Sequence, residues 1–194
     1  MIPIIVLAAG ESRRFGRNKL LAGYGSDTIV SKVVKTCHAS QADEVVVVLG
    51  HDAEAIRSVI DESCKVVINE NYHLGQSSSV KVGLNSCSKY SEAVLFHPAD
   101  VALISPTDIN VVLDSYQSSA GSIVIASYQG KPGHPILFDK SIFDELAEIT
   151  EIGHGLKAIL RKHESNLTKV EATKEVLIDI DTFADYEKHV AGKL

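Results

Sequence analysis

Two kinds of hydrophobic pattern alternate along the chain. Short apolar runs, many of them β-branched, such as VVVVL at 45–49, are separated by longer segments in which apolar residues recur every three or four positions. Runs that are apolar throughout are typical of strands buried on both faces, as in a parallel sheet. The short runs predict strands at 2–7, 44–49, 66–69, 93–97, 122–128, 135–138, 167–171 and 176–180.

The longer segments predict helices in the intervals, at 28–39, 53–63, 78–86, 107–118, 140–147, 156–163 and 183–190. Strand–helix alternation of this kind predicts an α/β fold with three layers (α/β/α), Rossmann-like, around a mostly parallel sheet. The sequence contains no repeat, low-complexity tract or linker, and we expect a single domain over 1–194. Residues 128–163 are the least regular, and we expect a small excursion over the sheet edge there.

Composition narrows the class of protein. Hydrophobic residues make up 45% and charged residues 23%, as in globular proteins, and the net charge of -6 argues against general attraction to nucleic acids or acidic membranes. The three cysteines lack the spacing of a disulfide framework or zinc site, which favours reduced thiols. With no signal-like N-terminus or membrane-length apolar run, we expect a cytoplasmic protein without nucleic-acid or membrane partners.

The most informative stretch is IIVLAAGESRRFGRNKLL, residues 4–21. The first predicted strand ends in small residues, Ala8, Ala9 and Gly10, and basic residues follow within a few positions. Ligands of open parallel sheets bind beyond the carboxyl ends of the strands, where exposed backbone N–H groups and basic side chains can hold phosphates. The spacing fits neither a Walker A loop nor, in this loop, a G-x-G-x-x-G fingerprint. We therefore predict a phosphate site here, with a solvated basic turn as the alternative.

Two further segments place polar residues at element ends. GQSSSVKVG at 75–83 begins a predicted helix with serines, which either cap the helix or bind a polar ligand. Asp100 follows a buried strand, where a carboxylate is suited to Mg²⁺ but is more often structural. Asp181 begins the last predicted helix and also reads as a cap.

The opening loop resembles the signature L-A-A-G-x-S-x-R-[MF]-G-x-x-K of nucleotidyltransferases, most closely that of molybdenum cofactor cytidylyltransferases. The resemblance implies a sheet of the nucleotide-diphospho-sugar transferase type. The guanylyltransferase branch typically has L-A-G-G, so Ala9 favours cytidine over guanosine. The implied nucleotide pocket comprises Leu7, Ala8, Ala9 and Gly10 at the base, with Arg14 and Lys19 on the triphosphate.

Three other motifs of that family occur in the same order. G-x-S-x-S-x-x-x-G implies nucleotide contacts from Gln76, Ser77 and Ser79. L-x-D-x-P-x-[VI] and D-I-D-T-P-x-D imply that Asp100 and Asp181 bind Mg²⁺, although Ala102 and Phe183 replace the prolines. Asp179 is a weaker candidate metal ligand. The implied catalytic set is Arg14, Lys19, Asp100 and Asp181.

Two motifs concern the acceptor. PGHPILF resembles a family stretch that implies an acceptor role for His134, with a structural histidine as the alternative. EIGHGLKAIL resembles G-D-x-G-[AL]-[RK] and implies that Lys157 meets acceptor phosphate, but His154 replaces the acidic residue and leaves the acceptor open.

The resemblance implies transfer of CMP from CTP to the phosphate of molybdopterin, with release of pyrophosphate. A phosphate nucleophile is already ionised near neutrality, so positioning and electrostatics suffice without a general base. Docking to a molybdenum enzyme that receives the product is a further implied partnership. Two alternatives stay open: a nucleotidyltransferase for another phosphorylated acceptor, such as a sugar or alcohol phosphate, and a nucleotide-binding accessory protein without turnover.

Overall fold

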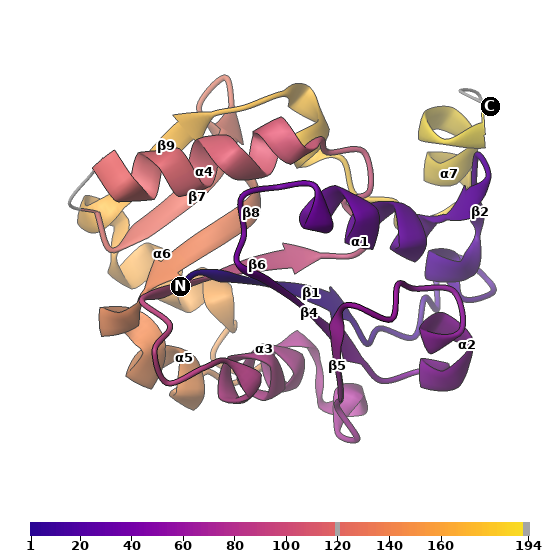
Figure 1. Ribbon diagram of the computed structural model, residues 1–194, viewed down its shortest axis with the longest axis horizontal. Coiled ribbons are helices and arrows are strands. Elements are labelled where there is room, and N and C mark those ends of the chain that lie inside the picture. Colours follow the sequence, from indigo (N-terminus) through magenta and orange to yellow (C-terminus); the bar gives the residue numbers. More distant parts are fainter. Residues whose placement is uncertain (119–120, 192–194) are drawn as a thin grey trace.

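A seven-stranded sheet forms the middle of the molecule in the computed structural model, which describes residues 1–118 and 121–191 (Figure 1). The strand order is β5–β4–β1–β6–β8–β7–β9, and every strand except β8 runs in the same direction. The strands are β1 (Pro3–Ala8), β4 (Glu44–Leu49), β5 (Lys65–Ile68), β6 (Ala93–Pro98), β7 (Ile123–Tyr128), β8 (Lys131–Asp139) and β9 (Leu167–Glu171).

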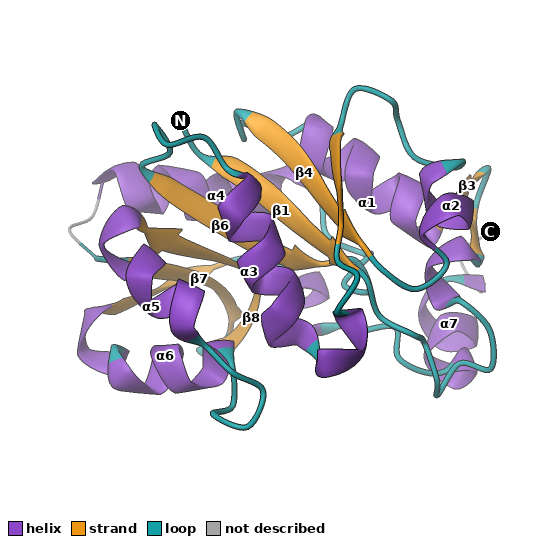
Figure 2. Cartoon of the chain, turned by 90° about the horizontal axis from the view of Figure 1, so that it is seen from below, coloured by secondary structure: helices purple, strands orange, loops and turns teal. Residues whose placement is uncertain are grey.

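Helices cover both faces of this sheet, as Figure 2 shows from the side of α3, α5 and α6. The helices are α1 (Ile29–His38), α2 (Ala53–Arg57), α3 (Gln76–Ser86), α4 (Pro106–Ser118), α5 (Phe143–Glu148), α6 (Leu156–Lys162) and α7 (Phe183–His189). A small hairpin, β2 (Gly23–Tyr24) with β3 (Asp27–Thr28), lies outside the sheet. None of the described helices has the length and apolar character that crossing a membrane requires. Since helices lie on both faces of the sheet, the predicted three-layer α/β fold is confirmed. The single domain stays a prediction.

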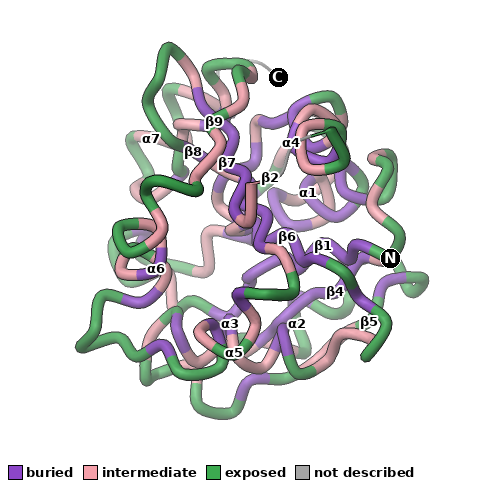
Figure 3. Tube along the Cα trace, turned by 90° about the vertical axis from the view of Figure 1, so that its left-hand side faces the viewer, coloured by how far each residue is buried: buried purple, intermediate pink, exposed green. Residues whose placement is uncertain are grey.

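The sheet separates two apolar cores. Ile4 and Val6 of β1 face the core under α1 and α4, whereas Ile5 faces the core under α3, α5 and α6. Successive side chains of a strand point to opposite faces, so a strand covered on both sides must be apolar throughout. The central strands are accordingly buried along their length (Figure 3).

Two expectations about the sheet are wrong. Residues 176–180 form no strand: Lys174–Leu177 is a 3₁₀ turn (η5), and the apolar alternation reflects Val176 and Ile180, which are buried without pairing in the sheet. The irregular region 128–163 does not leave the sheet edge, because β8 inserts between β6 and β7. Its pairing with β7 is irregular between Ile125 and Ser127, which accommodates this proline-containing strand.

The predicted helix at 53–63 is also wrong in its second half, since α2 ends at Arg57. The side chain of Asp61 accepts a hydrogen bond from the backbone N–H of Ser63 at 2.7 Å, and its carbonyl accepts one from Cys64. Short polar side chains that bond to nearby backbone groups compete with helix formation. The apolar spacing alone carries no sign of this competition.

Candidate active site

A cleft of about 400 Å³ opens at the carboxyl ends of β1 and β6, where the opening loop meets the start of α3. This is the end of a parallel sheet at which ligands bind. The cleft is lined by Leu7, Ala9, Gly10, Glu11, Ser12, Arg13, Arg14, Lys19, Leu20, Tyr72, His73, Gly75, Gln76, Ser79, Pro98, Asp100 and Asp181.

The opening loop is anchored by a buried aromatic side chain that packs against the last helix. The loop turns at Ser12, whose φ of 53° is left-handed and whose carbonyl accepts a hydrogen bond from the N–H of Phe15. The Phe15 ring is buried edge-on against Phe183 and Tyr186 of α7, at centroid distances of 5.7 and 5.9 Å. The polar part of the loop therefore faces the cleft while its apolar part is anchored to the last helix.

Lys19 is the most constrained basic side chain of the cleft. It begins a 3₁₀ turn, η1 (Lys19–Leu21), which Asn18 caps by accepting a hydrogen bond from the N–H of Leu20. The Lys19 ammonium donates to Asp100 Oδ2 at 2.7 Å and to Asp181 Oδ1 at 3.0 Å. Burial by itself lowers the pKa of Lys19, but the two carboxylates outweigh it and the pKa is raised, so the side chain stays charged.

The two carboxylates reach the cleft from segments that bind each other. The backbone N–H of Ile180 donates to the carbonyl of Asp100 at 3.0 Å, which fixes Asp181 beside the end of β6. The turn after Asp100 is braced by buried His97, whose Nε2 lies 3.1 Å from the Val101 carbonyl. On the other side, Thr182 and Asp185 form a capping box that starts α7 directly after Asp181.

This arrangement suits a divalent cation with oxygen ligands. Asp100 and Asp181 already share one cationic group, the Lys19 ammonium, and Mg²⁺ is commonly bound by one or two carboxylates together with substrate phosphates. Over the described ranges, no three His, Cys, Asp or Glu side chains converge as a complete protein site. Asp179 lies near enough that burial and then Asp100 and Asp181 raise its pKa, which leaves it a poorer anionic ligand.

Arg14 also contacts the carboxylate pair, with Nη2 2.9 Å from Asp181 Oδ2, although most of its side chain is exposed. Arg13, next to it, pairs instead with Glu11 at 2.6 Å. The structure thus brings together all four members of the predicted catalytic set, Arg14, Lys19, Asp100 and Asp181.

The predicted nucleotide residues divide into two groups. Leu7, Ala9, Gly10, Gln76 and Ser79 line the cleft, as do Arg14 and Lys19. Ala8 and Ser77 do not. Ala8 is buried within β1, while the N–H and hydroxyl of Ser77 donate to Glu151 Oε2 at 3.0 and 2.6 Å. Ser77 instead borders a second hollow of about 250 Å³, which Glu151 and His154 also line.

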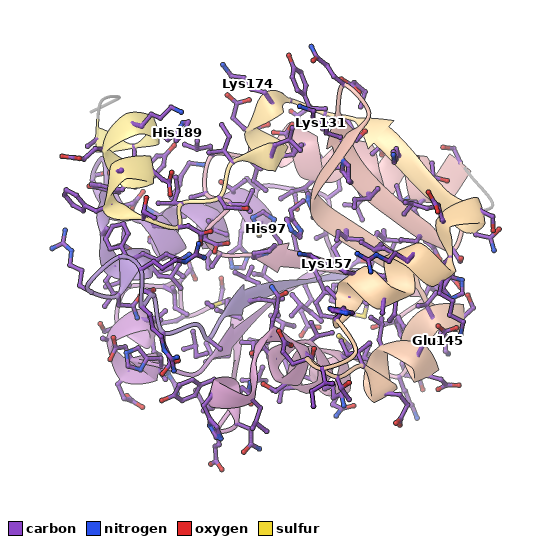
Figure 4. All side chains as sticks on the ribbon, turned by 180° about the vertical axis from the view of Figure 1, so that it is seen from behind. His97, Lys131, Glu145, Lys157, Lys174 and His189 are labelled. Carbon is purple, nitrogen blue, oxygen red and sulfur yellow. The ribbon has the colours of Figure 1, made fainter. Side chains whose placement is uncertain are left out.

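Neither predicted acceptor residue lines the main cleft. Lys157 lies on α6 (Figure 4) and borders the second hollow. His134, on β8, has a buried Nδ1 without a hydrogen-bond partner among the described residues. Burial lowers the pKa of His134 to about 4, against the opposing effect of Asp100, so the ring is neutral at physiological pH. Their acceptor role stays a prediction.

Several cleft residues were not predicted. Tyr72 and His73 belong to the 3₁₀ turn η2 (Tyr72–Leu74) between β5 and α3, and their position directly before Gly75 is the signal that would have identified them. Ser12 lies in the opening motif itself, and its buried Oγ has no partner within residues 1–118 and 121–191. These three residues therefore add polar side chains to the lining of the cleft.

Comparison with known proteins adds relatives of nearly full length. The chain is 27% identical over 188 residues to nicotine blue oxidoreductase of Paenarthrobacter nicotinovorans, covering 92% of this chain and 91% of that protein. It superposes with a TM-score of 0.86 on the crystal structure of the Rv0371c homologue of Mycobacterium sp. strain JC1, at 27% identity and covering 98% and 96% of the two chains.

Rv0371c of Mycobacterium tuberculosis H37Rv gives a TM-score of 0.85 at 25% identity, with 98% and 97% of the chains covered. A second structure of Rv0371c is a complex with manganese, and there the TM-score is 0.81 at 24% identity, with 98% of each chain covered. Residues 4–167, which include the opening loop, α3 and Asp100, match one family of nucleotidyltransferases. The chain belongs to the MobA-like NTP transferase domain family.

Proposed function

We propose that this nucleotidyltransferase is a CTP:molybdopterin cytidylyltransferase, which joins CMP to the acceptor phosphate and releases pyrophosphate. The observation that carries the proposal is the contact of Lys19 with both Asp100 and Asp181 at the phosphate end of the cleft. Two carboxylates that already attract a cation suit a metal ion. The adjacent loop of small and basic residues suits the triphosphate that the metal accompanies.

Each charged residue has a separate part in the proposed reaction. Asp100 and Asp181 would hold Mg²⁺, which when bound would screen the α-phosphate from the incoming anion. Lys19 and Arg14 turn from the carboxylates to the β- and γ-phosphates and stabilise the charge on the departing pyrophosphate. The manganese complex of Rv0371c supports the use of a divalent metal ion by proteins of this fold.

The preference for cytidine rests on the size of the base end. Ala9 is buried, and a Cβ placed on neighbouring Gly50 would lie only 2.9 Å from the Ala9 methyl, so this methyl has little room to move back from a bound base. A glycine at position 9 would leave more room for the larger guanine. The resemblance of the opening motif to that of cytidylyltransferases points the same way.

The test is pyrophosphate release from CTP, GTP, ATP and UTP, with Mg²⁺ and molybdopterin present. We expect pyrophosphate release from CTP that needs both metal and acceptor. Asp100→Asn is expected to reduce this release by roughly 100-fold or more and to unfold like the wild type. Release that is equal for all four nucleotides contradicts the base assignment. Full activity of Asp100→Asn contradicts the metal assignment.

Two observations on the acceptor side favour a second candidate, which is transfer to another phosphorylated molecule, such as a sugar or alcohol phosphate. Lys157 lines a separate hollow, and His154 stands where the resembled family has an acid. Turnover of CTP with such an acceptor, and none with molybdopterin, selects this candidate.

An accessory protein without turnover and an oxidoreductase, the class named by the Paenarthrobacter relative, are the remaining alternatives. Tight CTP binding without pyrophosphate release from any acceptor identifies the former. Consumption of NADH or NADPH, followed by absorbance, identifies the latter.

A further inference from the structure

A buried amide lies directly behind the serines of α3. Asn69 follows β5, and 1% of its surface is exposed. Its backbone N–H donates to the Leu49 carbonyl at 2.7 Å, which continues the pairing of β5 with β4 for one more residue. The side chain does not line the cleft, so it can act on a ligand only through its neighbours.

The hydrogen bonds of this amide determine its orientation. The backbone N–H of Asn71 donates to Asn69 Oδ1 at 3.0 Å, and a backbone N–H can only donate. The Nδ2 atom therefore faces α3, where it donates to Ser78 Oγ at 2.8 Å and to Ser79 Oγ at 2.9 Å. Both amide hydrogens are used, and both serine oxygens act as acceptors.

The two hydroxyl groups then differ in what they have left to donate. The Ser78 hydroxyl lies 2.7 Å from the Gly75 carbonyl and 3.0 Å from that of Asn71, so its hydrogen stays within the protein. For Ser79, no residue of the described chain accepts the hydroxyl hydrogen, and Ser79 lines the cleft. A hydroxyl that already accepts one hydrogen bond is polarised and donates more strongly.

We propose that Asn69 is a positioning residue that presets Ser79 as a hydrogen-bond donor to the nucleotide. Ser79 and Leu7 lie at the end of the cleft assigned to the base, so the donor selects nucleotides that present an acceptor atom there, such as the O2 carbonyl of a pyrimidine. The inference rests on the proposed nucleotide site. It adds that, in the contact between Ser79 and the nucleotide, the protein is the hydrogen-bond donor.

The test is Asn69→Asp, which keeps the shape of the side chain and replaces the NH₂ group by a second acceptor oxygen. The hydroxyl of Ser79 then donates to this carboxylate and no longer to the ligand. We expect the Kd for CTP, measured by calorimetry, to rise about tenfold, as for the loss of one hydrogen bond. We also expect KM to rise with kcat nearly unchanged, which a general loosening of the site does not produce.

Two serine variants separate the effect from added charge. Ser79→Ala is expected to weaken CTP binding to a similar degree, and Ser78→Ala, which loses a bond to the same amide, is expected to leave the Kd unchanged. In a double-mutant cycle, Asn69→Asp adds little to Ser79→Ala if it acts through that hydroxyl. Fully additive losses, or an unchanged Kd in Asn69→Asp, overturn the inference.

Failure of the proposed function has a different signature. If the wild-type protein binds none of the four nucleoside triphosphates, the nucleotide site itself is wrong, and with it this inference. If the wild-type protein binds CTP and both Asn69→Asp and Ser79→Ala bind it equally well, only the positioning role is wrong. Thermal unfolding of each variant, followed by circular dichroism, shows whether the fold is retained.

Discussion

Single residues of the cleft are held by groups that never face it. His97 is fully buried, and its ring braces the turn that carries Asp100 through the Val101 carbonyl. Its Nδ1 is buried and has no partner in the described part of the chain. A neutral ring tolerates this position, whereas a charged ring would lose its hydration with no carboxylate bonded to it.

This placement predicts a pH dependence of stability. Burial, together with neighbouring His134, lowers the pKa of His97 to about 3, while the unfolded chain binds the proton near pH 6.5. The stability that neutral His97 contributes is therefore fully present above about pH 6.5. Below this pH it is lost by about 1.4 kcal/mol of unfolding free energy per pH unit. When the pH is lowered from 7 to 5.5, we expect the free energy of unfolding, measured with urea, to decrease in both proteins. The decrease should be about 1–2 kcal/mol smaller in His97→Gln than in the wild type. Equal losses would show that His97 does not titrate as described.

At the scale of elements, one helix owes its position to a missing side chain. α3 packs on β1 and β4 at Gly83, where an added Cβ would lie 2.6 Å from Ile5 Cγ2 and 3.2 Å from Val48 Cγ2. Both neighbours are fully buried, so neither can move out into solvent. The close approach of helix and sheet keeps Ser79 of the same helix at the wall of the cleft.

Gly83→Ala tests this contact, because two effects oppose each other. Alanine gains about 1 kcal/mol in helix propensity, but overpacking a rigid core costs about 1–3 kcal/mol. We expect a net destabilisation of about 1–2 kcal/mol in urea unfolding. The exposed Asn85→Ala, in the same helix, serves as the control and should be neutral or slightly stabilising. A more stable Gly83→Ala protein would contradict the tight packing.

A second element is fixed by one carboxylate. Asp108, in the first turn of α4, accepts hydrogen bonds from the N–H and hydroxyl of Ser105, both at 2.8 Å, and from the N–H of Thr173 at 2.9 Å. Burial raises the pKa of Asp108, but these donors outweigh it and the pKa is lowered. The carboxylate thus joins α4 to the segment that leads to η5.

Asp108→Ala is expected to cost about 2–3 kcal/mol in the free energy of unfolding near neutral pH, because it leaves buried donors unpaired. A carboxyl with a lowered pKa stabilises the fold above its unfolded value, near pH 4, and loses this effect as the pH falls through the folded value. The difference between wild type and variant should therefore shrink below about pH 4 in urea unfolding. A difference that is independent of pH would assign the effect to packing.

At the scale of the whole molecule, the site depends on contacts between the two ends of the chain. Lys19 meets Asp100 and Asp181, which lie 81 and 162 positions further along. α7 lies beside the β2–β3 hairpin in Figure 1, and the Tyr186 hydroxyl donates to the Gly23 carbonyl at 2.9 Å. The ring of Tyr186 also supports Phe15, so the last helix holds the opening loop from outside the cleft.

We therefore expect Tyr186→Ala to weaken CTP binding several-fold in calorimetry, although Tyr186 does not line the cleft. The reason is that the loop loses the support of its buried aromatic anchor. Tyr186→Phe keeps the ring and loses only the hydrogen bond to Gly23, so its affinity for CTP should stay close to that of the wild type. If both variants bind CTP as the wild type does, the loop is held without α7.

The layers of this fold, and the small and basic character of its opening loop, could be read from the sequence alone. The apolar runs of β1 and β4 and the order of small and basic residues from Ala8 to Lys19 are local patterns, legible in neighbouring residues. What it could not determine depends on packing between distant segments. The 176–180 segment has the alternation of a strand but pairs with none, and β8 enters the sheet from a stretch that reads as irregular.

The same holds within the site. Ser77 and Ser79 are two positions apart on one helix, and only the tertiary structure turns the first to Glu151 and the second to the cleft. Likewise, Asp181 reads as a helix start until the bond between Ile180 and Asp100 brings it to Lys19. Local pattern reports whether a residue is buried and in which element, whereas the partner of a polar group depends on which segments the core brings together.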